Sequence, residues 1–274
     1  GLWQPFDMMD VMKDEILGLG LTRVRLTVNS LEQVTEGKTV VELTRSEFII
    51  DPNHDEIFTI LAENGVQITY TLSFWDKDCA CTEEVLSGPR FKTEDQIQRY
   101  LDFTQFIVSH FKDRVQYFEI WNEPELDVPG QRIDVEDYVH LVKQAVPVIR
   151  QEAPGAKIQV GGSPLRWGRE YLFDIFKSDI MPLVDAISWH PFYGESPECC
   201  AEYYYSYPSV VREIKSVASS HGFQGEYVAD ELNWWVYDQT ADQPWRYSNE
   251  QAAKYHARSI VLHLGMDIAV SLNG

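Results

Sequence analysis

The chain has 274 residues with 43 acidic and 23 basic side chains, so its formal net charge is −20. An acidic excess of this size argues against a nucleic-acid partner, which needs a clustered basic face, and it equally disfavours binding to an anionic membrane surface. No apolar run approaches the ~18 residues of a transmembrane helix. The apolar content of 44% is that of an ordinary globular chain with a buried core.

Helical patterns alternate with short β-branched or aromatic runs along the chain. The predicted helices cover residues 6–19, 55–63, 93–111, 135–151, 170–176 and 209–219, with a last one from Ser248. The predicted strands cover residues 22–28, 66–74, 115–121, 157–160, 186–190, 227–231 and 268–272. Pro147 predicts a helix kink, and Ser248 followed by Gln251 is the pattern of a capping box.

This alternation gives seven helix-then-strand units. Strands separated by helices form parallel sheets. One further strand before residue 1 and one further helix after residue 274 would complete an eight-stranded (β/α)8 TIM barrel, an α/β fold of typically ~250 residues. A doubly wound open sheet is the competing arrangement, but the chain has neither a GxGxxG nor a Walker A loop. We predict one α/β barrel domain over residues 1–274, truncated at both ends.

In such a barrel the active site lies where the strands end. Glycosidic-bond cleavage requires two carboxyl groups: one stays protonated to donate to the leaving oxygen, and the other attacks the anomeric carbon or activates water. Aromatic side chains offer flat faces for sugar rings, and Asn or His can hydrogen-bond to hydroxyl groups. The predicted strands carry these residue types at or near their C-terminal ends: Arg25, Trp75, Trp121, Asn122, Glu123, His190, Tyr193, Glu231, Trp234 and Trp235.

Three segments at these strand ends resemble the retaining glycoside hydrolases of clan A. They are FEIWNEPEL at residues 118–126, ISWHPFY at 187–193 and VADELNWW at 228–235. The resemblance is nearest to the β-xylosidase-like enzymes of family 39, followed by families 5 and 51. It covers most of the chain between Arg25 and Leu272.

The resemblance implies a double-displacement mechanism. Glu123 matches the acid/base of the clan, Glu231 matches the nucleophile, and Asn122 matches the group that binds the substrate 2-hydroxyl. For retention of configuration the two carboxyl groups are expected ~5–5.5 Å apart. Strict strand alternation would send Asn122 and Glu123 to opposite faces, so both can enter the site only if the strand has ended or bulges there.

Supporting roles follow from the same resemblance. His190 and Tyr193 match a sixth-strand pair in which the tyrosine hydrogen-bonds the nucleophile, and Arg25 matches an arginine that keeps the nucleophile ionised. A structural salt bridge is the alternative for Arg25, and a core position is the alternative for His190. Asp230 is the rival nucleophile. The chain departs from the clan in ending its last strand without a tryptophan.

Three further sets of side chains lie near the predicted strand ends. Glu119 is expected to be an inner acid paired with a cation. The tryptophans at 75, 234 and 235 are sugar platforms if exposed and packing residues if buried. The three tyrosines at 203–205 follow the loop after the predicted strand at 186–190 and are expected to wall the cleft.

The four cysteines fall as Cys79-Ala80-Cys81 and Cys199-Cys200, and their spacing does not fit a zinc site. Disulfides that staple the two loops together are favoured, a bond between Cys199 and Cys200 is the rarer alternative, and four free thiols are the third possibility. Disulfides fit a secreted or extracytoplasmic protein.

The sequence therefore predicts a retaining glycoside hydrolase with a carbohydrate substrate and no metal or organic cofactor. The family alone points to a β-linked xylose or similar pentoside, from plant or microbial polysaccharides. A non-catalytic carbohydrate-binding barrel is the alternative. A metal-dependent barrel hydrolase is less favoured, because it needs a His-x-His pair and the 274 residues contain none.

Overall fold

The computed structural model describes residues 13–26, 41–43, 48–50, 52–73, 89–127, 131–236 and 247–273. The chain divides into two compact units, unit 1 at residues 1–160 and unit 2 at residues 161–274. The prediction of a single barrel domain concerns how the two units combine, and it stays a prediction. No described helix is long and apolar enough to cross a lipid bilayer.

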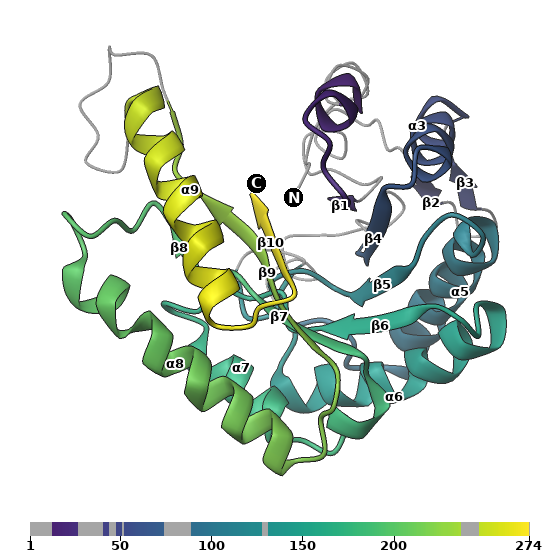
Figure 1. Cartoon of the computed structure of the whole chain (residues 1–274). Helices are drawn as coiled ribbons and strands as arrows, with labels where there is room; N and C mark the ends of the chain where they lie inside the picture. Colours follow the sequence, from purple (N-terminus) through teal and green to yellow (C-terminus); the bar gives the residue numbers. More distant parts are fainter. Residues whose placement is uncertain are drawn as a thin grey trace. The chain divides into compact units, whose positions relative to one another are not determined.

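Unit 1 contains parallel strands in sequential order, which are β1 (Arg23–Leu26), β4 (Gln67–Leu72), β5 (Tyr117–Ile120) and β6 (Lys157–Val160). The helices of this unit are α3 (Pro52–Glu63), α5 (Glu94–Phe111) and α6 (Val135–Glu152). A short antiparallel pair, β2 (Val41–Leu43) and β3 (Phe48–Ile50), lies inside the predicted loop before α3. Residues 13–18, from the first predicted helix, are helical. Figure 1 shows α5 and α6 together on one side of β5 and β6.

Polar and apolar residues alternate along these four strands, which puts them on opposite faces. The apolar face packs against helices: the Tyr70 ring lies 5.7 Å from that of Phe58 on α3 and 5.4 Å from that of Phe111 on α5. The polar face is also buried, and its groups bond to one another, as when Gln159 Nε2 donates to Glu119 Oε1 at 2.9 Å. Such mutual pairing removes the cost of burying polar groups.

Unit 2 continues the alternation of strands and helices with the parallel strands β7 (Ala186–Trp189), β9 (Glu226–Asn233) and β10 (Val270–Asn273). The two-residue β8 (Phe192–Tyr193) follows β7 after His190-Pro191 and pairs with the end of β9. The helices of this unit are α7 (Arg169–Phe176), the 3₁₀ turn η1 (Met181–Leu183), α8 (Ala201–Ser220) and α9 (Asn249–Gly265). Each of the seven predicted strands overlaps one parallel strand in the part of the chain that the structure describes.

Helix α8 corrects one prediction. It begins at Ala201 rather than at residue 209, so Tyr203, Tyr204 and Tyr205 lie in its first turns, and their role as a cleft wall stays a prediction. Pro208 lies inside this helix, at a position where proline carries a stability cost. Packing overrides it, because the Tyr204 ring stacks on Phe192 at 5.3 Å between ring centroids.

The capping box predicted at Ser248 is confirmed. Helix α9 begins with a capping box in which Ser248 Oγ accepts from Gln251 N and Gln251 Oε1 accepts from Ser248 N. Helix α6 runs without a break through Pro147, and the kink predicted there stays a prediction. Gly161 has a φ of +119°, and a Cβ there would lie 2.1 Å from the Ser188 carbonyl oxygen, so only glycine fits where the chain leaves β6.

Candidate active site

The backbone leaves the extended conformation at once after β5. Trp121 has a φ of +66° and Glu123 a φ of +47°, both in the left-handed region. L side chains adopt this region at a cost of about 1–2 kcal/mol per residue. The turn removes the strict alternation that would send Asn122 and Glu123 to opposite faces. Asn122 and Glu123 were expected to enter one site only if the strand ends or bulges at this point, and the strand does end here.

Asn122 is held in a fixed orientation. Its Oδ1 accepts from Arg25 Nη2 at 2.6 Å, and its carbonyl oxygen accepts from Gln131 Nε2 at 2.9 Å. The amide is buried, and its Nδ2 has no hydrogen-bond partner among the described residues. Because arginine can only donate, its bond to Oδ1 decides which amide atom is oxygen. Asn122 therefore keeps a donor to offer to a ligand.

Arg25 also forms a buried ion pair with Glu119. Arg25 Nε lies 2.6 Å from Glu119 Oε2, and the two side chains are 4% and 0% exposed. Thr71 Oγ1 donates to the same carboxylate oxygen at 2.9 Å. Glu119 is thus the predicted inner acid with a cationic partner. Arg25 bonds to Glu119 and to Asn122, the residue before Glu123. Its predicted action on Glu231 stays a prediction.

Glu123 lies half-buried in the turn after β5. Its carbonyl oxygen accepts from Leu126 N at 3.1 Å, and the carbonyl oxygen of Pro124 accepts from Ile133 N at 2.7 Å. These two backbone hydrogen bonds fix the chain at Glu123 and at the residue that follows it. Glu123 is therefore positioned by a structured turn at the C-terminal end of its strand.

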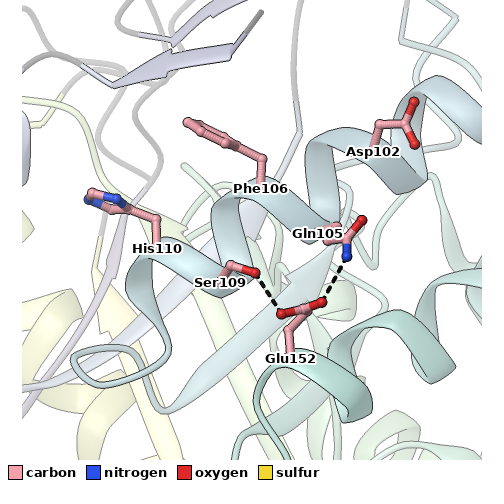
Figure 2. Close-up of a pocket in the computed structure, with 6 residues that line it drawn as sticks. All are labelled: Asp102, Gln105, Phe106, Ser109, His110 and Glu152. Carbon is pink, nitrogen blue, oxygen red and sulfur yellow. Dashed lines mark hydrogen bonds between the residues drawn. The ribbon is translucent and has the colours of Figure 1, made fainter.

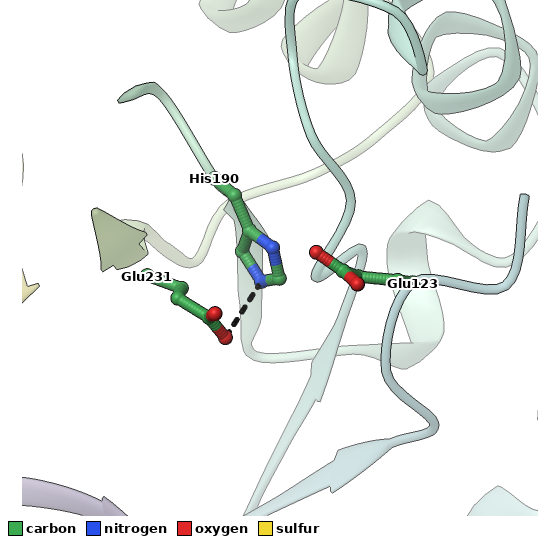
Figure 3. A group of neighbouring side chains, drawn as sticks. All are labelled: Glu123, His190 and Glu231. Atoms are coloured by element: carbon green, nitrogen blue, oxygen red, sulfur yellow. Dashed lines mark ion pairs between the residues drawn. The ribbon is translucent and has the colours of Figure 1, made fainter. Parts of the chain in front are cut away.

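His190 follows β7 in unit 2 and is completely buried. Its ring Nδ1 lies 2.7 Å from the Tyr193 hydroxyl. Its Nε2 lies 3.5 Å from Asp230 Oδ1 and 4.0 Å from Glu231 Oε2. Figure 3 shows this ring nitrogen directed at the Glu231 carboxylate. If the tyrosine donates to Nδ1, the neutral ring carries its proton on Nε2, toward the two carboxylates.

Asp230 and Glu231 differ in access, although they are neighbours on β9. The side chain of Asp230 is 0% exposed and that of Glu231 is 14% exposed. A nucleophile must reach the anomeric carbon of a bound sugar, which favours Glu231. Asp230 lies where it can act on His190.

Tyr193 connects the histidine to a row of aromatic rings. Its hydroxyl contacts His190, and its ring centroid lies 5.9 Å from that of Trp235 and 5.8 Å from that of Trp167. Its backbone N–H donates to Glu195 Oε2 at 2.5 Å. The predicted hydrogen bond from Tyr193 to Glu231 stays a prediction.

Two of the predicted sugar-binding tryptophans are packing residues. Trp121 is 3% exposed, and its ring meets those of Phe91 and Tyr100. Trp234 is 1% exposed and donates from Nε1 to the Glu195 carbonyl oxygen at 2.8 Å. Both rings are covered by neighbours that are distant in sequence, so neither can act as an open platform. Trp75 lies outside the described residues.

Trp235 is half-exposed, in line with its prediction, and the structure adds Trp167. Trp167 is 56% exposed in the segment between β6 and α7. It follows the Gly161-Gly162-Ser163 turn that ends a predicted strand. Inspection of a few more residues beyond that strand end would have identified it.

The cysteines of unit 2 correct a further expectation. Cys199 and Cys200 are bonded to each other and do not staple this loop to another one. The bond lies in a tight turn, where Cys199 N donates to Ser196 Oγ at 3.2 Å and Cys200 N donates to the Ser196 carbonyl at 3.0 Å. Cys79 and Cys81 lie outside the described residues.

A separate pocket lies on α5 and the end of α6 in unit 1, away from the strand ends (Figure 2). Ser109 Oγ and Gln105 Nε2 donate to the Glu152 carboxylate at 2.7 and 2.8 Å. These hydrogen bonds, that of Ser109 first, hold the pKa of Glu152 below its usual range. His110 Nε2 lies 2.6 Å from Asp55 Oδ1. The polar groups of this pocket thus serve to join helices, and they carry no pair of carboxyl groups poised for catalysis.

No known family model matches the sequence, and no curated protein is significantly similar to it in sequence. Solved structures match its fold. A family 39 glycoside hydrolase from the gut symbiont Bacteroides cellulosilyticus aligns with 98% of this chain and 52% of its own, at 16% identity and a TM-score of 0.66. An exo-β-1,4-mannosidase from an Opitutaceae bacterium aligns over 99% and 49%, at 15% identity and a TM-score of 0.69.

A family 39 β-xylosidase from Caulobacter crescentus aligns with 99% of this chain and 59% of its own, at 18% identity and a TM-score of 0.63. The chain therefore spans about half the length of these proteins. The predicted resemblance is confirmed at the level of the fold. This chain has the (β/α)8 barrel fold of the clan A glycoside hydrolases, and its described residues contribute seven parallel strands.

Proposed function

We propose that this chain is a retaining glycoside hydrolase that cleaves O-glycosidic bonds by double displacement, with Glu231 as nucleophile and Glu123 as acid/base. The observation that carries the proposal is the pair of glutamates at the C-terminal ends of β5 and β9, in a chain with the barrel fold of glycoside hydrolases. Each has supporting polar groups within its own unit: Asn122 beside Glu123, and His190 beside Glu231.

In the first step the Glu231 carboxylate attacks the anomeric carbon, while the carboxyl group of Glu123 donates its proton to the departing oxygen. The C–O bond to the leaving group breaks as the glycosyl ester forms. In the second step Glu123, now ionised, removes a proton from water, and the water oxygen attacks the anomeric carbon. The ester bond breaks, and both carboxyl groups return to their starting states.

Asn122 would donate from Nδ2 to the sugar 2-hydroxyl, because its Oδ1 is already occupied by Arg25. His190 would orient the Glu231 carboxylate through its Nε2, which lies near the carboxylates of both Asp230 and Glu231. These groups orient the reacting atoms and need no metal ion. We propose a neutral β-linked sugar as substrate, with a pentoside such as xylose as first choice. One matching structure is a β-xylosidase and another an exo-β-1,4-mannosidase, so both sugars belong in the test.

The test combines kinetics with rescue. A panel of aryl β-glycosides identifies the sugar that is hydrolysed. On that sugar E231G should lower kcat by about 10³-fold or more, and azide should restore turnover by replacing the lost nucleophile, with a glycosyl azide of inverted configuration as product. E123A should lose about 10²–10⁴-fold on a poor leaving group and far less on an activated dinitrophenyl glycoside, which departs without protonation.

The exposed Glu250 on α9 supplies a matched control, and E250Q should keep full activity. D230A and D230G address the rival nucleophile. If azide rescues the alanine or glycine variant of Asp230 and not E231G, the assignment of the nucleophile is wrong. If no glycoside is turned over by the full chain, or if a chelator abolishes turnover, the proposed reaction is wrong.

A further inference from the structure

Three aromatic rings from three separate segments of unit 2 lie next to one another. Trp167 comes from the segment before α7, Tyr193 from β8 and Trp235 from the segment after β9. Tyr193 is the middle ring: the Trp235 ring lies 5.9 Å from it with 28° between the planes, and the Trp167 ring 5.8 Å with 35°. The Tyr193 and Trp235 rings are stacked, and the Trp167 ring is tilted against the Tyr193 ring.

This aromatic row is open to solvent. Trp167 is 56% exposed, and Tyr193 and Trp235 are half-buried. The buried tryptophans 121 and 234 show that the fold can cover such rings elsewhere. Large apolar side chains left exposed in contact with one another are a mark of a binding surface.

A buried carboxylate holds the three segments in place. Glu195 is 1% exposed, and its Oε1 accepts from Arg166 Nη1 at 2.9 Å while its Oε2 accepts from Tyr193 N. Its carbonyl oxygen accepts from Trp234 Nε1 at 2.8 Å. Arg166 and Trp234 directly precede Trp167 and Trp235. Glu195 therefore anchors each segment at or beside its aromatic residue, so little order has to be gained on binding.

The row is linked to the proposed nucleophile, Glu231, through His190. The Tyr193 hydroxyl lies 2.7 Å from His190 Nδ1, and His190 Nε2 lies 4.0 Å from Glu231 Oε2. Trp167 and Trp235 extend from Tyr193. A ligand held on the row is thus adjacent to the reacting centre.

We infer that Trp167, Tyr193 and Trp235 form a platform for a second sugar ring, beyond the one whose bond is cleaved. The inference rests on the proposed function for its substrate class. Pyranose rings present C–H groups of partial positive charge, which match the negative faces of aromatic rings. Arg166, a cation bonded to this framework, is paired with Glu195, so the platform suits a neutral oligosaccharide rather than an acidic one.

The test measures binding and turnover separately. In the E231Q chain, which binds without hydrolysis, calorimetry with xylotetraose and mannotetraose should detect binding of one of them. W167A in this background should weaken that affinity about tenfold or more. E195Q, which loses the ion pair with Arg166, should weaken it as well. The control is L264A, which removes a large apolar side chain that is 72% exposed on α9 and outside the row, and it should bind as the parent does.

In the otherwise unchanged chain, W167A should lower kcat/KM about tenfold more on the tetraose than on the aryl glycoside of the same sugar, because the aryl glycoside has no second ring to bind. Equal losses on both substrates, equal tetraose affinity with and without W167A, or no tetraose binding by the E231Q chain would each overturn the platform. Binding that depends on Trp167 in a chain that hydrolyses no glycoside would overturn the proposed function and leave the platform standing.

Discussion

Glu123 combines a proposed catalytic role with a backbone conformation that glycine would adopt more easily. Its φ of +47° and the φ of +66° at Trp121 lie on either side of Asn122. Backbone strain of this kind persists where surrounding contacts impose it, and it gathers at functional sites. Here the imposed turn is what frees Asn122 and Glu123 from strand alternation.

Replacing Glu123 tests this strain directly. E123G and E123A both lack the carboxyl group, but only glycine is relaxed at this φ. We expect E123G to be more stable than E123A by about 0.5–1 kcal/mol, since the relief outweighs the greater freedom of glycine in the unfolded chain. Urea unfolding of the two variants measures the difference. An E123A chain as stable as E123G would show that the turn is not strained.

Arg25 and Glu119 illustrate how a buried charge constrains a site. Glu119 accepts hydrogen bonds from Arg25, Thr71 and Gln159, all within one buried layer. The second arm of Arg25 then fixes the amide of Asn122. The Arg25 guanidinium group therefore both neutralises the buried Glu119 carboxylate and orients Asn122 for its proposed role.

Loss of Arg25 should therefore cost stability. R25M keeps most of the side-chain volume but leaves the Glu119 carboxylate buried without its cation, at a cost of about 3–5 kcal/mol. R132M is the control, because Arg132 pairs with Asp127 and Asp134 while 46% exposed, and such pairs contribute little. Denaturant unfolding of both variants checks the contrast. Equal effects would contradict a strong role for the buried pair.

At the scale of elements, β7, α8 and α9 are joined by a chain of polar groups. Trp189 Nε1 donates to the Tyr207 hydroxyl at 3.0 Å, and that hydroxyl lies 2.9 Å from His263 Nε2. Since Tyr207 already accepts from Trp189, its own proton goes to His263, whose Nε2 must then be unprotonated. Burial lowers the pKa of His263 to about 4.

This histidine predicts a pH dependence of stability. Above its unfolded pKa of about 6.5 it is neutral in both states. As the pH falls toward 4 the unfolded chain takes up a proton that the folded chain does not, so the free energy of unfolding decreases, by about 2 kcal/mol near pH 4.5. H263Q should lose less stability than the parent between about pH 7 and pH 4.5. H221Q, at an exposed position, should follow the parent, and parallel curves for all three would refute the assignment.

At the scale of the whole molecule, the net charge of −20 repels itself in the compact state. Such a charge keeps anionic partners away and suits a neutral carbohydrate. It also makes stability depend on ionic strength, because dissolved ions screen the repulsion over distances longer than the Debye length.

We therefore expect sodium chloride to raise the midpoint of thermal unfolding by a few degrees, at roughly 2–4 °C per kcal/mol gained. The rise should be steep up to about 0.15 M, where the Debye length has shrunk from ~30 Å at 0.01 M to ~8 Å, and level off beyond it. Scanning calorimetry along a salt series measures the curve. A midpoint that stays constant, or that rises linearly to high salt, would contradict charge repulsion as the cause.

Three features could be predicted from the amino-acid sequence alone: the order of strands and helices, the capping box at Ser248, and the succession of Glu123 and Glu231 at strand ends. These features depend on local patterns: apolar periodicity, alternation along a strand and a cap within one turn. The position of Glu119 as an inner acid could be predicted for the same reason, because every second residue of a strand lies on one face.

The three-dimensional structure was needed to learn which aromatic rings are covered and which cation pairs with each acidic side chain. Trp121 and Trp234 are buried while Trp167 is exposed, although all three lie at or beyond the ends of predicted strands. Arg25 meets Glu119 across 94 positions of sequence. Burial and ion pairing depend on atoms brought together from distant positions, and no local pattern encodes which atoms those will be.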